Sequence, residues 1–543
     1  MNNSKYFYHF WRSTSSIQEQ PCTPERHGAT ASKWGIATAI ISLTLAACGP
    51  SGSSAGTSSV SSAPPKSSAP ATLIVDQANS PATLDPGLQY DTDSYVVYRN
   101  IFDQLVRRDP TTLKIIPWVA SSWSQPDPTT WIFKIRNGIK FSDGSSLTAA
   151  DVAFSLNRIL DPSFASPQFA NFSVVQSVAA SGETVTITTK APSPTLLTFL
   201  TTLSIVPEQY VTKVGEQAFD LHPIGSGPYI LSDWTQGTDV ILKANLNYWA
   251  GKPPYPTVEF RTVPLAASRV ADLKSGAADI AIELDPDNAT QIQGGSTGLK
   301  VIATPTERIA DLYMNSLNGP TASLTVREAI AYAIDYPSII ANLEHGYAKP
   351  VKEVLTPASF GYTNTVAGFQ YNPTKAKQLL AAANNPHPNL VLPTSPSFST
   401  TVVQAIQADL EAVGFTVQIV TTDQPTFLKN IQAPTHNWGS IRYGIWSCSC
   451  LDADGTIYPL FHTGSIWSSY SNPAFDQLVT NARTTLDIAQ RKQYYRQAFA
   501  ILQSDVPAVG LWQYYAIDGV KSNISWNPGP QETFFIPQIK WIG

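Results

Sequence analysis

From residue 71 onward, short segments in which apolar residues recur at every second position are interspersed with segments of helical spacing. Three segments have apolar residues at every second position or are rich in β-branched residues. They predict strands at residues 72–75, 131–136 and 184–189. Alternation of this kind is typical of strands with one buried face.

Helices are indicated by capping residues ahead of apolar positions spaced three or four apart. Thr148 and Asp151 precede a predicted helix over 152–160, and Asn372-Pro373 precedes one over 374–383. Two further helices are expected, one after the capping-box pattern Thr325 to Glu328 and one over 488–503. Strands and helices in this mixture favour an α/β fold over a sandwich or a bundle.

Composition narrows the function classes. Charged residues make up 14 % of the 543-residue chain, whereas about 25 % is usual in soluble domains, and 43 % of the residues are hydrophobic. The net charge is −5 and no long basic run occurs, which argues against a nucleic-acid-binding protein.

The N-terminal segment has the pattern of an export signal. An apolar run over 34–47 follows Lys33 and ends at Cys48. This run is shorter than the roughly 20 residues that a transmembrane helix needs, and it fits the apolar region of a signal peptide. The sequence Leu45-Ala-Ala-Cys48 resembles a lipobox, which implies cleavage before Cys48 and acylation of that cysteine.

We therefore interpret residues 1–47 as a lipoprotein signal peptide and 48–70 as a lipidated cysteine with a flexible Ser/Gly/Pro-rich tether. Only Cys448 and Cys450 remain in the rest of the mature chain. A disulfide across Cys-x-Cys closes a very small ring, so we expect two reduced thiols. Two cysteines without a nearby histidine pair predict no zinc site.

No catalytic constellation can be assembled from the residues. The histidines are scattered, no close-spaced metal pair or phosphate-binding glycine loop occurs, and the G-x-S-x-G match at 52–56 lies in the tether. Asp452 and Asp454 are interpreted as an ordinary solvated acid pair on a loop. We expect no enzyme, no catalytic residue, no metal and no cofactor.

Several motifs in a fixed order resemble the family 5 extracellular solute-binding proteins, the dipeptide-, oligopeptide- and nickel-binding receptors of ABC importers. The resemblance covers about residues 72–520. The matching segments begin at Leu84-Asp85-Pro86 and continue through 102–110, 120–123, 133–152, 223–229, 247–249, 273–279, 326–335 and 470–476.

The resemblance implies a two-lobed periplasmic-binding-protein-like fold (type II, cluster C) with a ligand cleft between the lobes. Lobe I would comprise 71–282, with an extra subdomain at about 100–205, and lobe II 283–512. Residues 513–543 would return to lobe I, and the chain would cross between the lobes near 280–284 and 510–514.

The resemblance also implies hinge closure on a solute and delivery to a membrane permease complex. The solute would be a peptide or another small polar molecule. The receptor would act as a monomer, held at the outer face of the cytoplasmic membrane, in the cell envelope, by its lipid anchor.

Two loops of the family contact ligand, and the expected binding residues follow from them. They are Tyr90, Asp91 and Thr92 after the Leu-Asp-Pro motif, Trp446, Ser449 and Asp452 in the second lobe, and Ser226 in the turn between Gly225 and Gly227. That turn brings backbone close either to ligand or to a neighbouring strand. Typical peptide receptors carry an acid where Ser449 stands, and it pairs with the ligand's α-ammonium group. We therefore hypothesise a ligand without a free α-amino group at that subsite.

Other readings stay open at this point. The cargo could be a metal chelate, with His436 or His462 as a candidate ligand, an oligosaccharide or an opine-like compound. Arg442 is a candidate partner for a ligand carboxylate, and Trp446 and Trp467 are candidates either for stacking on ligand or for the core. A secreted hydrolase and a sensory lipoprotein are the alternatives from other classes.

Overall fold

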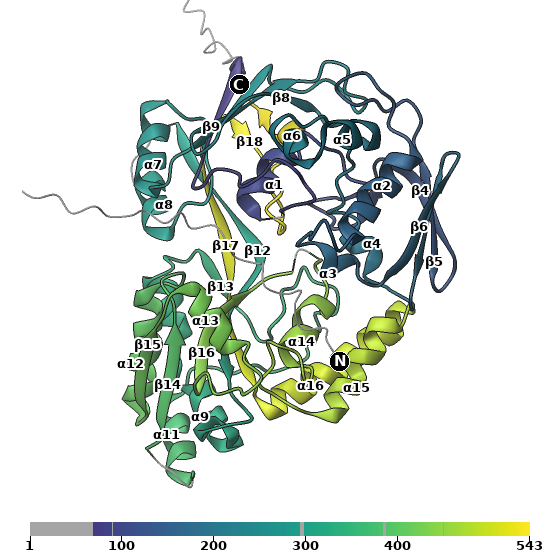
Figure 1. The fold of residues 1–543 in the computed structure, drawn as a ribbon. Coiled ribbons are helices and arrows are strands. Elements are labelled where there is room, and N and C mark those ends of the chain that lie inside the picture. The colour runs from purple at the N-terminus through teal and green to yellow at the C-terminus, as the bar shows by residue number, and fades with distance from the viewer. Residues whose placement is uncertain (1–68, 90, 294–297, 384–386, 449, 543) are drawn as a thin grey trace, which may run out of the picture. The chain divides into compact units, whose positions relative to one another are not determined.

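The computed structural model describes residues 69–543 except 90, 294–297, 384–386, 449 and 543, and the described residues form one compact unit. Figure 1 shows two groups of helices and strands joined by two long strands, β12 (Leu299–Met314) and β17 (Ala508–Lys521). None of the described helices combines the length and apolar character that a membrane crossing requires. Both groups combine helices and strands, which agrees with the expected two-lobed α/β fold.

Within the described residues, β12 and β17 lie in a nine-stranded sheet that extends through both lobes. The two strands pair antiparallel from Leu299–Lys521 to Tyr313–Ala508. The order is β16 (Ile441–Trp446), β12, β17, β11 (Ile280–Ala281), β1 (Thr72–Gln77), β10 (Thr257–Thr262), β9 (Asp239–Ala244) and β8 (Tyr229–Thr235), with β13 (Ala348–Pro350) also paired to β17.

Lobe I is built around β1, which pairs in parallel with both β10 and β11. Leu73 and Val75 of this strand are fully buried, which confirms the predicted strand at 72–75. The last segment of the chain completes this core, because Phe534 and Ile536 pack in the same cluster. The surrounding elements are α1 (Thr92–Tyr98), α5 (Glu208–Val214), α6 (Glu216–Leu221), α7 (Ala266–Ser275), α8 (Pro286–Gln293), β18 (Ile524–Ser525) and β19 (Lys540–Trp541).

A smaller core occupies the segment in which the extra subdomain is expected, and its buried residues run from Leu105 to Ile205. A four-stranded antiparallel sheet, on which α2 packs, contains both predicted strands. The capping box of α2 is confirmed, with the Thr148 amide donating to Asp151 at 2.8 Å. The elements are β2 (Val106–Arg108), β3 (Ile115–Pro117), β4 (Ala120–Asp127), β5 (Thr130–Ile135), α2 (Ala149–Leu160), α3 (Phe169–Phe172), β6 (Val175–Ser181), β7 (Thr184–Thr189) and α4 (Leu196–Phe199).

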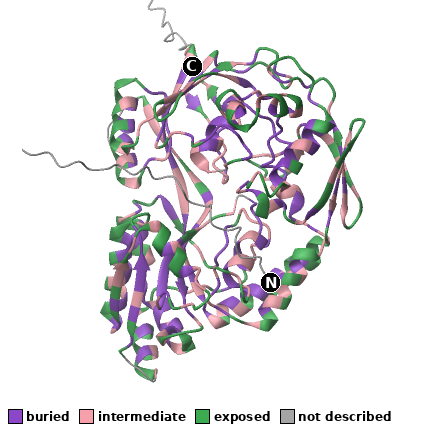
Figure 2. Cartoon of the chain, viewed as in Figure 1, coloured by how far each residue is buried: buried purple, intermediate pink, exposed green. Residues whose placement is uncertain are grey.

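Lobe II has two cores, one around the β14–β16 strands and one among the last helices. Figure 2 shows β14 and β16 largely buried beside α12, whose outer face is exposed. The elements are α9 (Leu324–Ala333), α10 (Tyr336–Asn342), α11 (Pro373–Ala382), β14 (Asn389–Thr394), α12 (Thr400–Val413), β15 (Thr416–Thr421), α13 (Gln424–Ile431), α14 (Asp454–Phe461), α15 (Pro473–Thr484) and α16 (Ile488–Asp505).

The predicted helices are present, and three of them begin one to three residues earlier than expected. Asn372 caps α11 by accepting the Lys375 amide, as expected. Helix α9, however, begins one residue before Thr325, with Ser323 at its N-cap. A short turn at Pro320–Ala322 leads directly into Ser323 and sets this earlier start.

The first crossing between the lobes lies further along the chain than the expected position at 280–284. After β11 the chain forms α8, whose Ala289 and Ile292 pack with Leu273 in the lobe I part of the structure. The crossing is made within β12, where the pairing with β17 shifts register between Pro305 and Ile309. Pro305 and Ile309 pair with Tyr515 and Gln513 of β17.

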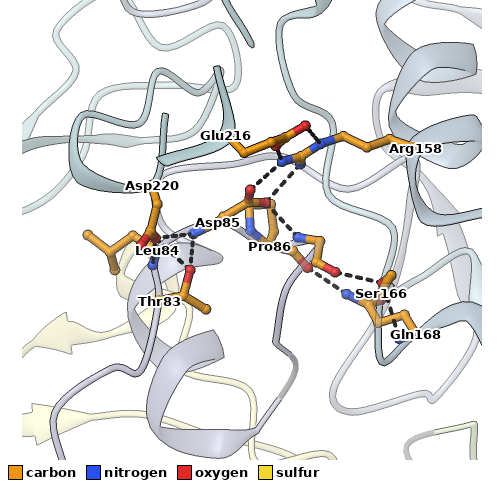
Figure 3. Close-up of polar contacts among 10 residues, drawn as sticks. Thr83, Leu84, Asp85, Pro86, Arg158, Ser166, Gln168, Glu216 and Asp220 are labelled. Atoms are coloured by element: carbon orange, nitrogen blue, oxygen red, sulfur yellow. Dashed lines mark hydrogen bonds and ion pairs between the residues drawn. The ribbon is translucent and has the colours of Figure 1, made fainter. Parts of the chain in front are cut away.

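A buried ion pair holds the Leu84-Asp85-Pro86 loop that leads into α1 (Figure 3). Asp85 is fully buried and accepts from Arg158 of α2, through Nη1 at 2.9 Å and through Nη2. Arg158 also donates from Nε to Glu216 at 3.2 Å. One arginine therefore ties the loop to two helices.

Polar contacts fix the two ends of the same loop (Figure 3). At the start of the loop, the Leu84 amide donates to Asp220 at 2.7 Å. At its end, Ser166 donates to the Gly87 carbonyl at 2.6 Å, and Gln168 donates to the Pro86 carbonyl at 2.5 Å. These contacts give α1 and the preceding loop a defined position.

We predict that Arg158→Met destabilises the protein much more than Glu216→Gln. The first change leaves the Asp85 carboxylate buried without its cation, which costs about 3–5 kcal/mol. The second removes an acid whose side chain is 50 % exposed, and exposed pairs contribute at most about 1 kcal/mol. The measurement is denaturant unfolding of residues 69–543. Equal losses of unfolding free energy in the two variants would contradict the assignment.

Candidate functional site

The expected lobe I binding residues lie at the start of α1. Asp91 is its N-cap and accepts the Ser94 amide at 2.8 Å, whereas Tyr90 lies outside the described residues. The Thr92 hydroxyl accepts from Arg308 at 3.4 Å. Arg308 belongs to β12, so this segment reaches the strand that crosses between the lobes.

Arg308 is held at this point by an ion pair with Glu532 near the C-terminus, with Nε and Oε1 3.0 Å apart. Acids gather around it. Burial, with repulsion from Glu283 and Asp91, raises the pKa of Asp93 to about 7. Burial also raises the pKa of Glu532, although Arg308 opposes that shift. The region between α1 and β12 is therefore rich in carboxyl groups that are only partly neutralised.

The expected lobe II residue Trp446 ends β16 and forms part of a pocket. Its indole Nε1 donates to the Gly455 carbonyl at 3.0 Å, and its ring meets the edge of Trp467 with centroids 5.4 Å apart. The pocket is small and partly open to solvent. It is lined by Glu307, Ile309, Val354, Leu355, Thr356, Ser359, Trp446, Cys448 and Thr456.

Glu307 is the one charged residue among the described residues that line this pocket. Its Oε2 atom is buried and accepts no hydrogen bond from any described residue. Burial raises the pKa of Glu307 to about 8; repulsion from Glu532 adds to the shift, and Arg308 and Arg108 oppose it. No sequence motif pointed to Glu307, because it lies in the interior of a strand between the family's matching segments.

Arg108 of β2 brings lobe I against the loop that carries Cys448 and Cys450. Its Nη2 donates to the Cys450 carbonyl at 3.2 Å, and its Nη1 donates to the Leu113 carbonyl at 2.8 Å. Its Nε is buried and makes no hydrogen bond to a described residue. Burial lowers the pKa of Arg108, against the effect of Glu307 and Asp452. Arg108 is a second polar group near the pocket that the sequence analysis did not identify.

Asp452 does not belong to a solvated acid pair, so that interpretation was wrong. It is 4 % exposed, and both of its oxygens accept from Arg491 at 2.7 Å. Asp454 is also buried and pairs with Arg483 at 3.1 Å. The structure thus places the expected ligand residue Asp452 in an ion pair within lobe II, and Ser449 lies outside the described residues.

Ser226 is fully buried and donates to Asp103 at 3.1 Å, so it is not open to a ligand here. The glycines beside it explain why. A Cβ atom on Gly225 would lie 2.0 Å from the Ile101 carbonyl oxygen, and one on Gly227 would lie 2.6 Å from backbone oxygen. Of the two roles considered for this turn, the structure shows close packing against the neighbouring chain segment.

Cys448 and Cys450 form a disulfide, so the expectation of two reduced thiols was wrong. A turn in which the Leu451 amide donates to the Cys448 carbonyl brings the two Cα atoms to 5.0 Å, within the range that disulfides span. Gly455 leaves the space for the sulfurs, because a Cβ atom there would lie 2.2 Å from Cys448 Sγ.

The remaining candidates lie away from the pocket lining. Arg442 is buried in lobe II, 4.0 Å from the ring of Tyr313, and His462 stacks on Tyr458 at 4.4 Å. His436 contacts Ser469 at 3.4 Å. In the described part of the chain, no three His, Cys, Asp or Glu side chains gather in a way that could hold a metal ion.

A larger pocket of about 410 Å³ lies inside lobe II, lined mainly by α16, the start of β17 and the loop after β13. It contains none of the expected binding residues. We regard the pocket at Trp446 as the candidate site, because it combines an expected ligand residue with side chains of the crossing strand.

The chain is similar to known proteins over most of its length. The family model "Bacterial extracellular solute-binding proteins, family 5 Middle" matches residues 114–468. The glutathione-binding protein GsiB of Escherichia coli is 29 % identical over 460 residues, covering 81 % of this chain and 88 % of that protein.

Among solved structures, DppA of Helicobacter pylori in complex with the peptide STSA has a TM-score of 0.73 at 24 % identity, covering 87 % of this chain and 98 % of that one. The substrate-binding protein CtaP of Listeria monocytogenes has a TM-score of 0.78 at 23 % identity, covering 87 % of this chain and 99 % of that one. These likenesses show the fold. The family model matches more than half of the length of this chain. The chain is therefore a binding protein and not an enzyme, and it belongs to the bacterial extracellular solute-binding proteins of family 5.

Proposed function

We propose that this protein captures peptides or peptide-like solutes outside the cytoplasmic membrane and delivers them to an ABC importer permease. The observation that carries the proposal is the pocket at Trp446, which is lined by residues of both β12 and the lobe II loops. The names of GsiB, which binds glutathione, and of DppA, crystallised with a peptide, support the same class of cargo.

The chemistry of the pocket suits such a solute. Trp446 and Leu355 supply apolar surface, the hydroxyls of Thr356 and Thr456 offer hydrogen bonds, and Glu307 offers one negative charge. The exposed surface of this lining is more polar than apolar, which suits a polar solute. Within the described residues no cluster favours a metal chelate.

Capture requires a closed form that binds the solute more tightly than an open one does. The strands β12 and β17 are the natural hinge, because both pass from one lobe to the other. The contact of Arg108 with the Cys450 carbonyl joins the lobes beside the pocket. Solute seated between these parts would favour the closed form, which the permease would then recognise.

We also propose that the protein is held at the outer face of the cytoplasmic membrane by lipid on Cys48. The support is the order of the N-terminal segment: a basic residue, an apolar run, two alanines, the cysteine and a polar tether. Cys48 and the tether lie outside the described residues.

We expect residues 69–543, purified without denaturation, to carry a bound peptide. Tightly held solute survives purification when its dissociation is slow. Native mass spectrometry would show a bound mass that fragments as a peptide. A bound sugar or metal chelate would overturn the peptide assignment. For an empty protein, a thermal-shift screen with peptides, sugars and chelates would decide, since bound ligand raises the unfolding temperature.

We expect Cys48→Ser in the full chain to abolish incorporation of radiolabelled fatty acid and to move the protein from the membrane fraction to the soluble fraction. The matched control is Cys22→Ser, which removes a cysteine of the leader and should leave labelling unchanged. Full labelling of the Cys48 variant would show that lipid is attached elsewhere.

A further inference from the structure

We infer that Glu307 is the residue that binds the positively charged ammonium group of the solute. The inference rests on the proposed function and names the chemical class of its cargo: a peptide or amine-bearing solute whose cation enters the pocket beside Trp446. The binding group lies on the crossing strand and not in the lobe II loop where related receptors carry their acid.

The backbone around Glu307 fixes the direction of its side chain. Its amide donates to the Pro530 carbonyl at 3.2 Å, and its neighbours belong to β12. Glu307 and Arg308 lie between Pro305 and Ile309, where the regular pairing with β17 is interrupted. Arg308 contacts Thr92 and Glu532, whereas Glu307 lines the pocket.

The carboxyl group of Glu307 has an unused acceptor. Oε2 is buried and bonded to none of the described residues, which is costly for a polar atom. An ammonium group has three N–H donors and would satisfy this oxygen with a charge-assisted hydrogen bond. A neutral hydroxyl or amide donor would gain less, because the hydrogen bond would not be reinforced by opposite charges.

The two acids of the lobe II loop beside the pocket are already occupied. Both oxygens of Asp452 accept from Arg491, and Asp454 pairs with Arg483. Glu353, near the entrance of the other pocket, accepts from Thr363 at 2.9 Å. Since position 449 is a serine, Glu307 remains as the acid of the pocket.

The charges that face Glu307 come from four parts of the chain. Glu532 of the C-terminal segment repels it, while Arg308 of β12, Arg108 of β2 and Arg99 at the end of α1 attract it. Burial nevertheless dominates, and with a pKa of about 8 the empty pocket holds Glu307 mostly protonated at neutral pH.

A bound cation would stabilise the carboxylate and lower this pKa, so binding at neutral pH would release a proton. The sign follows from linkage. Affinity for a solute with an α-ammonium group rises with pH up to about 8 and falls again above it, because the α-amino group itself loses its proton near pH 8. It falls as the pH drops below 8, by at most tenfold per pH unit.

The test compares two probes on residues 69–543: a pool of tripeptides with free amino termini and the same pool after N-acetylation. Retention in equilibrium dialysis is read by mass spectrometry. We expect the wild type to retain the free-amino pool at least tenfold better than the acetylated pool. Glu307→Gln, which has nearly the same shape, should lose that preference, and Glu307→Asp should keep part of it.

Glu344→Gln is the matched control. Glu344 is also a buried acid, with its pKa raised to about 7 by burial, and it does not line the pocket. This variant should keep the wild-type preference. For the best-retained tripeptide, calorimetry in two buffers of different ionisation enthalpy should show proton release with wild type and Glu344→Gln, but not with Glu307→Gln.

The outcomes separate the two claims. If the wild-type protein is folded but retains neither pool, the proposed peptide-binding function is contradicted. The assignment of Glu307 is then contradicted as well. A wild type that binds both pools equally, or a Glu307→Gln variant that keeps the preference and the proton release, overturns the role of Glu307. Peptide binding as the function would stand in that case.

Discussion

The antiparallel pairing of β12 with β17 is the interaction on which the rest of the structure depends. It runs from Leu299–Lys521 in one lobe to Tyr313–Ala508 in the other, and β1, β11, β13 and β16 are placed by the sheet that it anchors. Paired strands bend at a change of register more readily than they do in a regular ladder. The shift between Pro305 and Ile309 therefore gives the two lobes a shared flexible point without breaking the sheet.

The candidate site uses the same few residues. Immediately after Pro305, one side chain of β12 turns to the solute pocket and the next turns to α1, where Arg308 meets Thr92 and Glu532. Under the proposed function, the contact with solute and the contact with α1 are made by adjacent residues of one strand. A change at either of them is transmitted over a single peptide unit, and no long chain of intervening contacts is needed to couple occupancy to closure.

The family motifs and the local hydrophobic pattern were sufficient to predict the fold class, several strand and helix positions and the pocket residue Trp446. They failed where side-chain partners come from distant segments. Nothing near Asp452 in the chain indicates that Arg491 takes both of its oxygens, and nothing near Ser226 indicates its contact with Asp103. Glu307 could not be found for the same reason, since its significance depends on burial and on partners that it lacks.

The position of the chain's last segment has a consequence for biogenesis. The lobe I core contains Leu73 and Val75 from the start of the described chain together with Phe534 and Ile536 from its end. An extracellular protein crosses the membrane before it folds, and lobe I cannot assemble its core until almost the whole chain has emerged. Contacts so distant in sequence form slowly. The lobe I core therefore stays incomplete through most of the chain's transit.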